Sequence, residues 1–535
     1  MADPRKASDA RNFSPSWHDL DHDQQRDALE LFLACLPLKY IVEVIIPATN
    51  AQLVADGMEG TTLGEFLRWL GLALIASLND AVPRSELWQD SIDPLRPHPN
   101  LREYMSRARF DAIQRRIRLV SGAAANPPLR DRFATVRGFI DAWNENMERR
   151  FIPSFMTCLD ESMVAWLNKW TCPGWVHLPR KPHPFGNEYH TIACAATHII
   201  FHVELVEGKD RPLQLPVPEH EAEFGKMGGL ILRMTKTIRD SNRIVIMDSA
   251  FCQLRTLIAM KKRGLYATAV IKKKRYWPKH IKGDDMDEEL KDTPIGTSKV
   301  LTGVLDGVPY SLVALRDSKH VLKLVSTWGN MDRVGRPKLR RHPITNQRVE
   351  FKYPSVISQY YQARHAVDDN NNIRQGSKSL EAGFQVNRWP LRQFLALVAV
   401  AEVNALCFFN YIRAKDSEIS VKASLSAPTL AQFRQDLAKR LIHNKHLCVA
   451  EDTEPSAKRP RRSKPEHVLQ KVPKYAGVWR NNQWTHIATP YAKHFCAGGD
   501  CDAEVREYCA CDKLVFWCTD CWGNVHLRSI FTTAK

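Results

Sequence analysis

Two aspartates of this chain directly follow short apolar runs, and a third lies in a stretch of helical character. Asp160 comes after Phe155–Leu159, Asp248 closes the β-branched run that begins at Arg243, and Asp368 lies in the helical stretch. Short apolar runs fold as buried strands, so the first two carboxylates are expected at strand ends. Carboxylates suit Mg²⁺, and two ions about 4 Å apart can stabilise both oxygens of an in-line phosphoryl displacement. Most single aspartates are surface groups or helix caps, so the arrangement carries more weight than any one residue.

The hydrophobic pattern changes near residue 151. Residues 26–150 show helical periodicity, whereas short runs of strand type follow from residue 151 onwards. The change predicts an all-α region followed by an α/β layer with a mixed sheet. Two acids at strand ends and a third on a later helix favour a ribonuclease-H-like catalytic core. Because 120 positions separate Asp248 from Asp368, more than a minimal core of that kind needs, we expect an insertion.

Domain boundaries follow from these patterns and from shifts in composition. The longest apolar stretch, Phe394–Ile412, contains Glu402, Asn404 and Asn410, so we expect a buried core helix rather than a membrane span. The polar N-terminus is not expected to act as a secretory signal. The expected segments are a disordered tail (1–25), a helical region (26–150), the first part of the core (151–290), an insertion (291–354), the last part of the core (355–415), a helical return (416–450), a basic linker (451–489) and a cysteine-rich module (490–535).

The chain is strongly basic, with a net charge of +17 and a pI near 9.3. A polyanionic partner is expected, with a generically basic soluble protein as the alternative. Two cation clusters flank the candidate catalytic acids, and we favour contact with DNA phosphates over a solvated surface. Trp277 and Trp389 are candidates for stacking on an unpaired base, with core packing as the alternative. The clusters are Lys272, Lys273, Lys274 and Arg275, and Arg333, Arg336, Lys338, Arg340 and Arg341.

A third group of cations falls in the expected linker. Five of them occur within seven residues, in a Pro-rich stretch that has no apolar periodicity. Such a cluster predicts a nuclear localisation signal, and hence a nuclear protein, with a nonspecific DNA tether as the alternative. The five are Lys458, Arg459, Arg461, Arg462 and Lys464.

Six of the 13 cysteines crowd into residues 496–521. Zinc is held by four Cys or His ligands in a tetrahedron, so this density favours metal over disulfides, with free buried thiols as the alternative. A module of this kind folds only with its metal. The expected ligands are Cys496, Cys501, Cys509, Cys511, Cys518, Cys521 and His526, with His494 or His486 as the eighth ligand for two Zn²⁺ ions.

The residues around the three aspartates resemble the piggyBac transposase family. The motifs occur in the family's order over roughly residues 60–412, and several co-linear motifs are far more specific than one. They are CLDES around Asp160, KPHPFG from Lys181 to Gly186, IVIMDSAF around Asp248, and NRWP at 387–390 followed by an apolar helix.

The resemblance implies a cut-and-paste DNA transposase that acts on double-stranded DNA. Mg²⁺ or Mn²⁺ at Asp160, Asp248 and Asp368 would support nicking at the transposon's terminal inverted repeats, hairpin formation and opening, and joining to a TTAA target. Pairing two ends implies a homodimer, with dimerisation and DNA binding expected of the N-terminal helices and the helical return. DNA contact is also implied for Lys181, Arg388 and Trp389.

For the zinc module, the resemblance implies a cross-brace that recognises DNA ends. One ion would be held by Cys496, Cys501, Cys518 and Cys521, and the other by Cys509, Cys511 and His526 with the eighth ligand.

One position departs from the family pattern. A fourth acid commonly follows the third by three residues, and Asn371 occupies that position here. Asp369 is a displaced candidate, although it points about 100° away from Asp368 on a helix. Asn371 and Asp369 are therefore candidate accessory ligands. Two other functions stay open: a domesticated, catalytically silent DNA- or chromatin-binding protein, and a chromatin-interaction protein whose zinc module binds peptide.

Overall fold

The computed structural model describes residues 14–91, 97–122, 131–273, 276–279, 281, 285–329, 337–376, 378–419 and 427–447, together with short strands between 469 and 516. The chain divides into two compact units, Met1–Ala450 and Glu451–Lys535. Side chains are described only in the first unit, as far as residue 416 and again over 427–447.

The N-terminal half of the first unit is helical, as the periodicity predicts. Polar caps start several of these helices: the Asp27 carboxylate accepts from the backbone of Leu29 and Glu30, and the Thr62 hydroxyl accepts from Glu65. A cap satisfies backbone N–H groups that a helix leaves unpaired. The main helices are α1 (Ala28–Ala34), α3 (Ile46–Ala55), α4 (Leu63–Leu78), α5 (Arg107–Arg116) and α6 (Ala134–Arg150), with a short α2 (Leu38–Tyr40).

A mixed sheet forms the other half of the unit. Its strand order is β4-β5-β3-β7-β8-β11-β10-β9, with β6 paired to β5. The β3–β7 and β7–β8 pairs are parallel, whereas β3–β5 and β5–β6 are antiparallel. The strands are β3 (Met156–Ala165), β4 (Trp175–His177), β5 (Phe185–Cys194), β6 (Ile200–Leu205), β7 (Ile244–Met247), β8 (Tyr266–Val270), β9 (Ser298–Leu305), β10 (Val308–Arg316) and β11 (Val321–Ser326).

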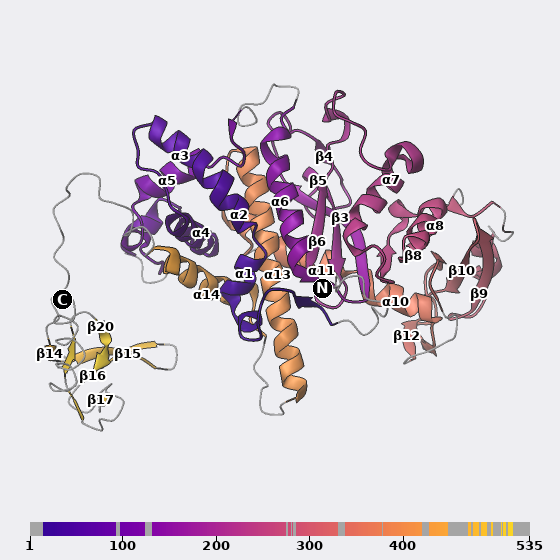
Figure 1. The fold of residues 1–535 in the computed structure, drawn as a ribbon. Helices are drawn as coiled ribbons and strands as arrows, with labels where there is room; N and C mark the ends of the chain where they lie inside the picture. The colour runs from indigo at the N-terminus through magenta and orange to yellow at the C-terminus, as the bar shows by residue number, and fades with distance from the viewer. Residues whose placement is uncertain are drawn as a thin grey trace, which may run out of the picture. The chain divides into compact units, whose positions relative to one another are not determined.

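Helix α13 (Trp389–Ile419) runs through the middle of the unit, with α3, α4 and α5 on one side and the sheet, against which α6 packs, on the other (Figure 1). It is long and apolar enough to cross a membrane, but 72% of its apolar window is buried inside the protein. One hydrophobic cluster extends from the N-terminal helices through α13 into the sheet. Residues Phe394–Ile412 therefore lie in the core helix that the sequence predicts.

The C-terminal part of the first unit returns to the helical half. Helix α14 (Leu430–Ile442) packs along α4 so closely that a Cβ atom at Gly71 would lie 2.8 Å from the Ala438 carbonyl oxygen. The remaining helices surround the sheet and the site: α7 (Glu221–Met234), α8 (Leu254–Lys262), α9 (Met286–Lys291), α10 (Ser355–Ala363), α11 (Ala366–Arg374) and α12 (Leu380–Gly383).

Three expected segments differ from the structure. Part of the expected tail is folded, because β1 (Ser16–Trp17) pairs with β2 (Phe151–Ile152) and Trp17 packs against Phe151 in the core. Within the expected insertion, β9, β10 and β11 extend the central sheet, because β11 pairs with β8. A separate hairpin is formed by β12 (Lys338–Arg341) and β13 (Arg348–Phe351).

The third difference concerns the linker. Strands β14 (Leu469–Lys471), β15 (Tyr475–Arg480) and β16 (Gln483–Ala488) lie within it, and β14 pairs with β19 (Glu507–Cys509) of the cysteine-rich segment. The second unit therefore begins before residue 490.

Candidate active site

The three candidate catalytic aspartates lie around one cavity. Asp160 is on β3, Asp248 directly follows β7, and Asp368 is on α11. Leu159 is opposite Met247 in the parallel β3–β7 pair, so two carboxylates come from adjacent positions of neighbouring strands. Helix α11 packs against β3 and supplies the third. The cavity has a volume of about 180 Å³ and is also lined by Cys158, Ile246, Met247, Tyr360, Arg364 and His365.

Asp160 differs from expectation in one respect. It lies in the middle of a ten-residue strand rather than at a strand end. The strand that ends there is the neighbour β7, whereas β3 continues to pair with β5 as far as Ala165. The apolar run before Asp160 therefore stops where a side chain faces a cavity, not where the backbone leaves the sheet.

The cavity is electrostatically unfavourable for carboxylates alone. Burial raises the pKa of Asp160 from 3.8 to about 7, and repulsion from the Asp368 carboxylate adds to the rise. A hydrogen bond from the Glu161 backbone N–H, 2.8 Å from Oδ1, and the charge of Lys181 oppose this shift without cancelling it. A bound cation would relieve such a site, because it stabilises the charged form of every carboxylate around it.

The donor set fits a hard divalent cation, although the side chains are not gathered around one. Within the described residues, no three His, Cys, Asp or Glu side chains converge closely enough to hold a metal ion as they stand. Three carboxylates from three elements nevertheless face one cavity, and oxygen ligands of this type suit Mg²⁺ or Mn²⁺. The Asp368 side chain is 49% exposed, so it has room to turn toward the other two.

Arg364 is a residue of this cavity that the sequence did not reveal. It is the only Arg or Lys among the described residues that line the cavity. Its guanidinium lies 4.8 Å from the ring centre of Tyr361, its buried Nε has no hydrogen-bond partner, and it forms no ion pair with the described residues. A guanidinium that has no carboxylate partner suits an anion bound between it and the neighbouring aspartates. A single arginine outside any basic run gave no signal in the sequence.

A larger cavity of about 580 Å³ adjoins the first and shares Asp248, Tyr360 and Arg364 with it. Lys272 and Arg340, two of the expected DNA contacts, line this cavity. Lys272 is exposed, whereas Arg340 donates to Asp317 at 3.1 Å. The expected contacts Lys273, Lys338 and Arg341 are exposed, the last two on β12. Cations of both clusters therefore occur near the carboxylates, where a polyanion would approach.

The two candidate accessory ligands do not line the cavity of the aspartates. Asn371 is buried, and its side-chain oxygen accepts from Arg374 Nη2 at 3.0 Å. Asp369 faces His198, with 3.6 Å between its Oδ2 and Nδ1 of the histidine. The position where the family commonly has a fourth acid is thus engaged with a buried arginine.

Both tryptophans considered for base stacking belong to the core. Trp389 is 4% exposed and its Nε1 donates to Asn187 at 2.6 Å. Trp277 is 7% exposed and its Nε1 donates to the Ile281 carbonyl. Neither ring presents a face to solvent, so the expected DNA contact of Trp389 is corrected to core packing.

Two further expected DNA contacts have partners inside the protein. Arg388 donates to the backbone carbonyls of Arg115 and Ile117, and burial lowers its pKa to about 10. Lys181 Nζ lies 3.4 Å from a carboxylate oxygen of Glu161. Both side chains bind other residues of the protein, so their presence in these sequence motifs has a structural explanation.

Other expected sites lie outside the described residues. His486, His494 and Cys509 fall on strands β16, β17 (His494–Phe495) and β19, whose side chains are not described. The remaining residues outside the description are the DNA-contact candidates Lys274, Arg275, Arg333 and Arg336, the localisation cluster Lys458, Arg459, Arg461, Arg462 and Lys464, and the zinc-ligand candidates Cys496, Cys501, Cys511, Cys518, Cys521 and His526.

Comparison with known proteins agrees with this architecture. A family profile described as "Transposase IS4" matches residues 27–406, a range that includes all three aspartates. Among solved structures, the chain is similar to the piggyBac transposase of a synaptic complex with hairpin DNA, determined by cryo-EM. The TM-score is 0.60 at 17% sequence identity, over 83% of this chain and 86% of that one. At this identity the similarity is one of fold. No curated protein matches the sequence.

Proposed function

The chain belongs to the IS4-type transposase family, piggyBac type, and from that premise we propose that it is a metal-dependent DNA transposase whose catalytic residues are Asp160, Asp248 and Asp368. The observation that carries the proposal is the shared cavity, which is lined by three aspartates from β3, the end of β7 and α11. The strand order β6-β5-β3-β7-β8, with two antiparallel and two parallel pairs, supports a ribonuclease-H-like core.

Divalent cations, Mg²⁺ or Mn²⁺, would be held by the three aspartates and would supply charge neutralisation at the reacting phosphate. The protein's own groups supply the rest. Arg364, which also lines the cavity, would donate to a phosphate oxygen, and its contact with the Tyr361 ring holds the guanidinium in place. The larger cavity with Lys272 accommodates the adjoining phosphates. Because the larger cavity opens beside Asp248, the strand can enter without displacing the core.

The finer steps are proposals on the same basis. Nicking, hairpin formation, hairpin opening and joining to TTAA are all in-line phosphoryl transfers, so one site can serve each in turn. Synapsis of two ends requires at least a homodimer. Nuclear localisation through residues 458–464 and two Zn²⁺ in the second unit complete the proposal. Support for these last points comes from sequence spacing alone.

Substitution of the aspartates tests the proposal. Asp160→Asn, Asp248→Asn and Asp368→Asn should each slow strand cleavage at least about 100-fold, because each removes a charge that stabilises the transition state. DNA affinity should change little. The matched control is Asp369→Asn, which alters the neighbouring carboxylate that faces His198 instead of the cavity.

The substrate for this test is a duplex that carries the sequence flanking the gene. Near-normal cleavage by one mutant would remove that residue from the site. A wild-type protein that binds these ends but never cleaves them, with any divalent metal, would instead identify the catalytically silent DNA-binding protein.

A further inference from the structure

A histidine lines the cavity of the aspartates and has no role in the fold. His365 directly precedes α11, and it lines the cavity together with Asp160, Asp248 and Asp368. Its side chain is 51% exposed, and Nδ1 lies 3.9 Å from Oδ2 of Asp368. Within the described part of the chain the ring makes no hydrogen bond. The imidazole is therefore available to a ligand in the cavity.

The first turn of α11 fixes where this ring lies. The His365 carbonyl accepts from the Asp369 backbone N–H at 2.7 Å, and residues three apart on a helix lie on one face. Two adjacent ligands of an octahedral ion, each about 2.1 Å from it, are roughly 3 Å apart. The 3.9 Å between His365 and Asp368 is close to that separation, and both side chains are about half exposed. A small rotation of each would let them share one cation.

The next turn of the same helix offers no such ligand. Asn371 follows Asp368 by three residues, but its oxygen accepts from Arg374 at 3.0 Å and it does not line the cavity. His365 precedes Asp368 by three residues and does line it. The cavity thus borders the start of α11, and His365 is the position from which this helix can supply a further ligand.

The thiol of Cys158 also lies at the cavity, but it is already engaged. Cys158 is 2% exposed, and its Sγ donates to the Arg364 carbonyl at 3.4 Å. A buried thiol with a partner in the fold is a packing group rather than a metal ligand. His365 therefore remains as the nitrogen or sulfur donor that a metal at the aspartates could use.

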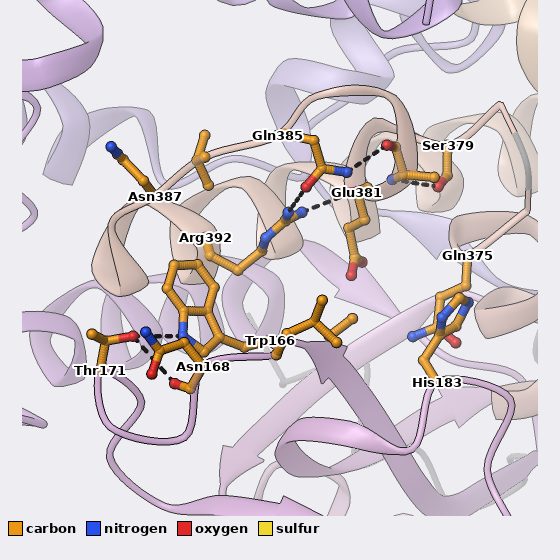
Figure 2. A pocket seen from close by; sticks show the side chains of 14 residues that line it. Trp166, Asn168, Thr171, His183, Gln375, Ser379, Glu381, Gln385, Asn387 and Arg392 are labelled. Carbon is orange, nitrogen blue, oxygen red and sulfur yellow. Dashed lines mark hydrogen bonds between the residues drawn. The ribbon is translucent and has the colours of Figure 1, made fainter.

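A histidine beside a cavity is not sufficient evidence by itself, as the cavity at the other end of α11 shows (Figure 2). His183 lies at that cavity, between the loop after β3 and the segment from α12 to the start of α13. Glu381 is the only acidic residue among the described ones that line it, and its carboxylate pairs with the buried Arg374. Divalent cations bind where carboxylates supply charge, so the three aspartates distinguish His365 from His183.

We propose that His365 is a metal ligand of the active site, and that the site consequently prefers a transition-metal cation such as Mn²⁺ over Mg²⁺. The proposal rests on the metal-dependent function above. Mg²⁺ takes oxygen ligands, whereas an imidazole nitrogen suits transition metals, whose affinity for nitrogen-containing sites rises from Mn²⁺ onwards. The carboxylates supply the charge that holds the cation, and the imidazole supplies the selectivity.

Pulsed electron paramagnetic resonance of Mn²⁺ tests this ligand without cleavage. A coordinated imidazole gives a modulation from the nitrogen nucleus that oxygen ligands do not give. We expect this modulation in the full wild-type chain with Mn²⁺ below the protein concentration, and its loss in His365→Ala and His365→Gln. His198→Asn is the matched control, because His198 faces Asp369 and does not line the cavity. The modulation should persist in this variant.

Metal competition gives a second readout. The ratio of Mn²⁺ to Mg²⁺ affinity should fall at least about threefold in His365→Gln, which offers an oxygen in place of the nitrogen. A residue that only supports the fold would change both affinities equally, and that result would overturn the proposal.

Asp248→Asn separates this proposal from the proposed function, because it should remove Mn²⁺ from the site. Mn²⁺ that depends on Asp248 but shows no nitrogen modulation in the wild type would overturn the role of His365 and leave the proposed function in place. Modulation that survives His365→Ala would do the same. Mn²⁺ binding that Asp248→Asn does not affect would instead refute the metal site at the aspartates, and both proposals with it.

Discussion

At the scale of single residues, Asp160 couples the site to pH. The pKa of Asp160 is about 7 without metal, so at pH 6 the Asp160 carboxyl is protonated in roughly nine-tenths of the molecules. A metal ion that binds there must displace this proton. We predict that affinity for Mn²⁺ falls about fivefold between pH 7 and pH 6 and changes little above pH 8. Calorimetry in buffers of different ionisation enthalpy should show close to one proton released per site at pH 6. Asp369→Asn should behave as the wild type; pH-independent affinity would contradict the prediction.

The raised pKa of Asp160 also determines how the free energy of unfolding changes with pH. Between the usual value of 3.8 and about 7, the folded protein binds more protons at Asp160 than the unfolded chain does. The stabilisation from this group is therefore fully present below pH 4 and declines as pH rises toward 7. Metal binding removes the effect, because it favours the charged carboxylate.

Arg364 provides a second prediction at this scale. Arg364→Ala should reduce cleavage about 100-fold with little change in DNA affinity, since one donor to the developing charge is lost. Arg364→Lys should recover only part of the rate, because an ammonium group cannot form the planar double contact or the stacking. Arg341→Ala, on the exposed β12 hairpin, is the contrast. The Arg341→Ala substitution should weaken DNA binding and reduce by about one the number of counterions released, as read from the slope of log affinity against log salt concentration. It should not slow cleavage of bound DNA.

The three acids that the sequence predicts to lie together do line one cavity, whereas both tryptophans expected to stack on bases are buried, and the difference has a physical reason. An acid that interrupts an apolar run is costly unless it has a role, so Asp160 and Asp248 stand out. The local sequence around a tryptophan beside basic residues is the same whether the ring is buried or exposed. Trp277 and Trp389 are core residues. The place of Arg364 beside the aspartates depends on neighbours distant in sequence, which no local pattern reveals.

At the scale of elements, the buried ion pair between α13 and α14 is the clearest target. Glu402 and Arg434 are at most 1% exposed and lie 2.6 Å apart. Glu402→Ala should lower the free energy of unfolding by about 3–5 kcal/mol, because it leaves Arg434 charged and unpaired in the core. Asp436→Ala, which breaks an exposed pair with Arg440 on the same helix, should cost less than about 1 kcal/mol. Urea unfolding measures both; equal effects would show that Arg434 finds another partner.

Sequence periodicity predicts which segments of the first unit are helices and which are strands. It does not predict which strands pair with each other in the sheet. The hairpin β9–β10 has strand periodicity, which is compatible with a separate domain or with an extension of the main sheet. The pairing of Leu324 with Val270 decides in favour of extension. Likewise, Trp17 lies in a largely polar stretch without apolar periodicity, so its place beside Phe151 depends on the tertiary fold.

At the scale of the whole molecule, the two units predict a division of labour. Residues up to Ala450 form a compact unit of their own, so a chain ending there should fold and retain salt-sensitive binding to any DNA. It should lose preference for the terminal repeats over scrambled duplexes if the cysteine-rich module of the second unit recognises the ends, as the family resemblance implies. Competition binding measures the preference. Equal weakening on both duplexes would refute end recognition and favour a peptide-binding or purely structural unit.

The zinc content of the protein tests the role proposed for the second unit. Seven candidate ligands and either His494 or His486 suffice for two tetrahedral sites, so the full chain should contain two Zn²⁺. Cys518→Ser should release zinc and abolish end preference together, because the metal-binding energy is also folding energy. Cys407→Ser, at a half-buried thiol of α13, is the matched control and should leave both unchanged. Fewer than about 1.5 zinc ions per chain would contradict the two-site arrangement.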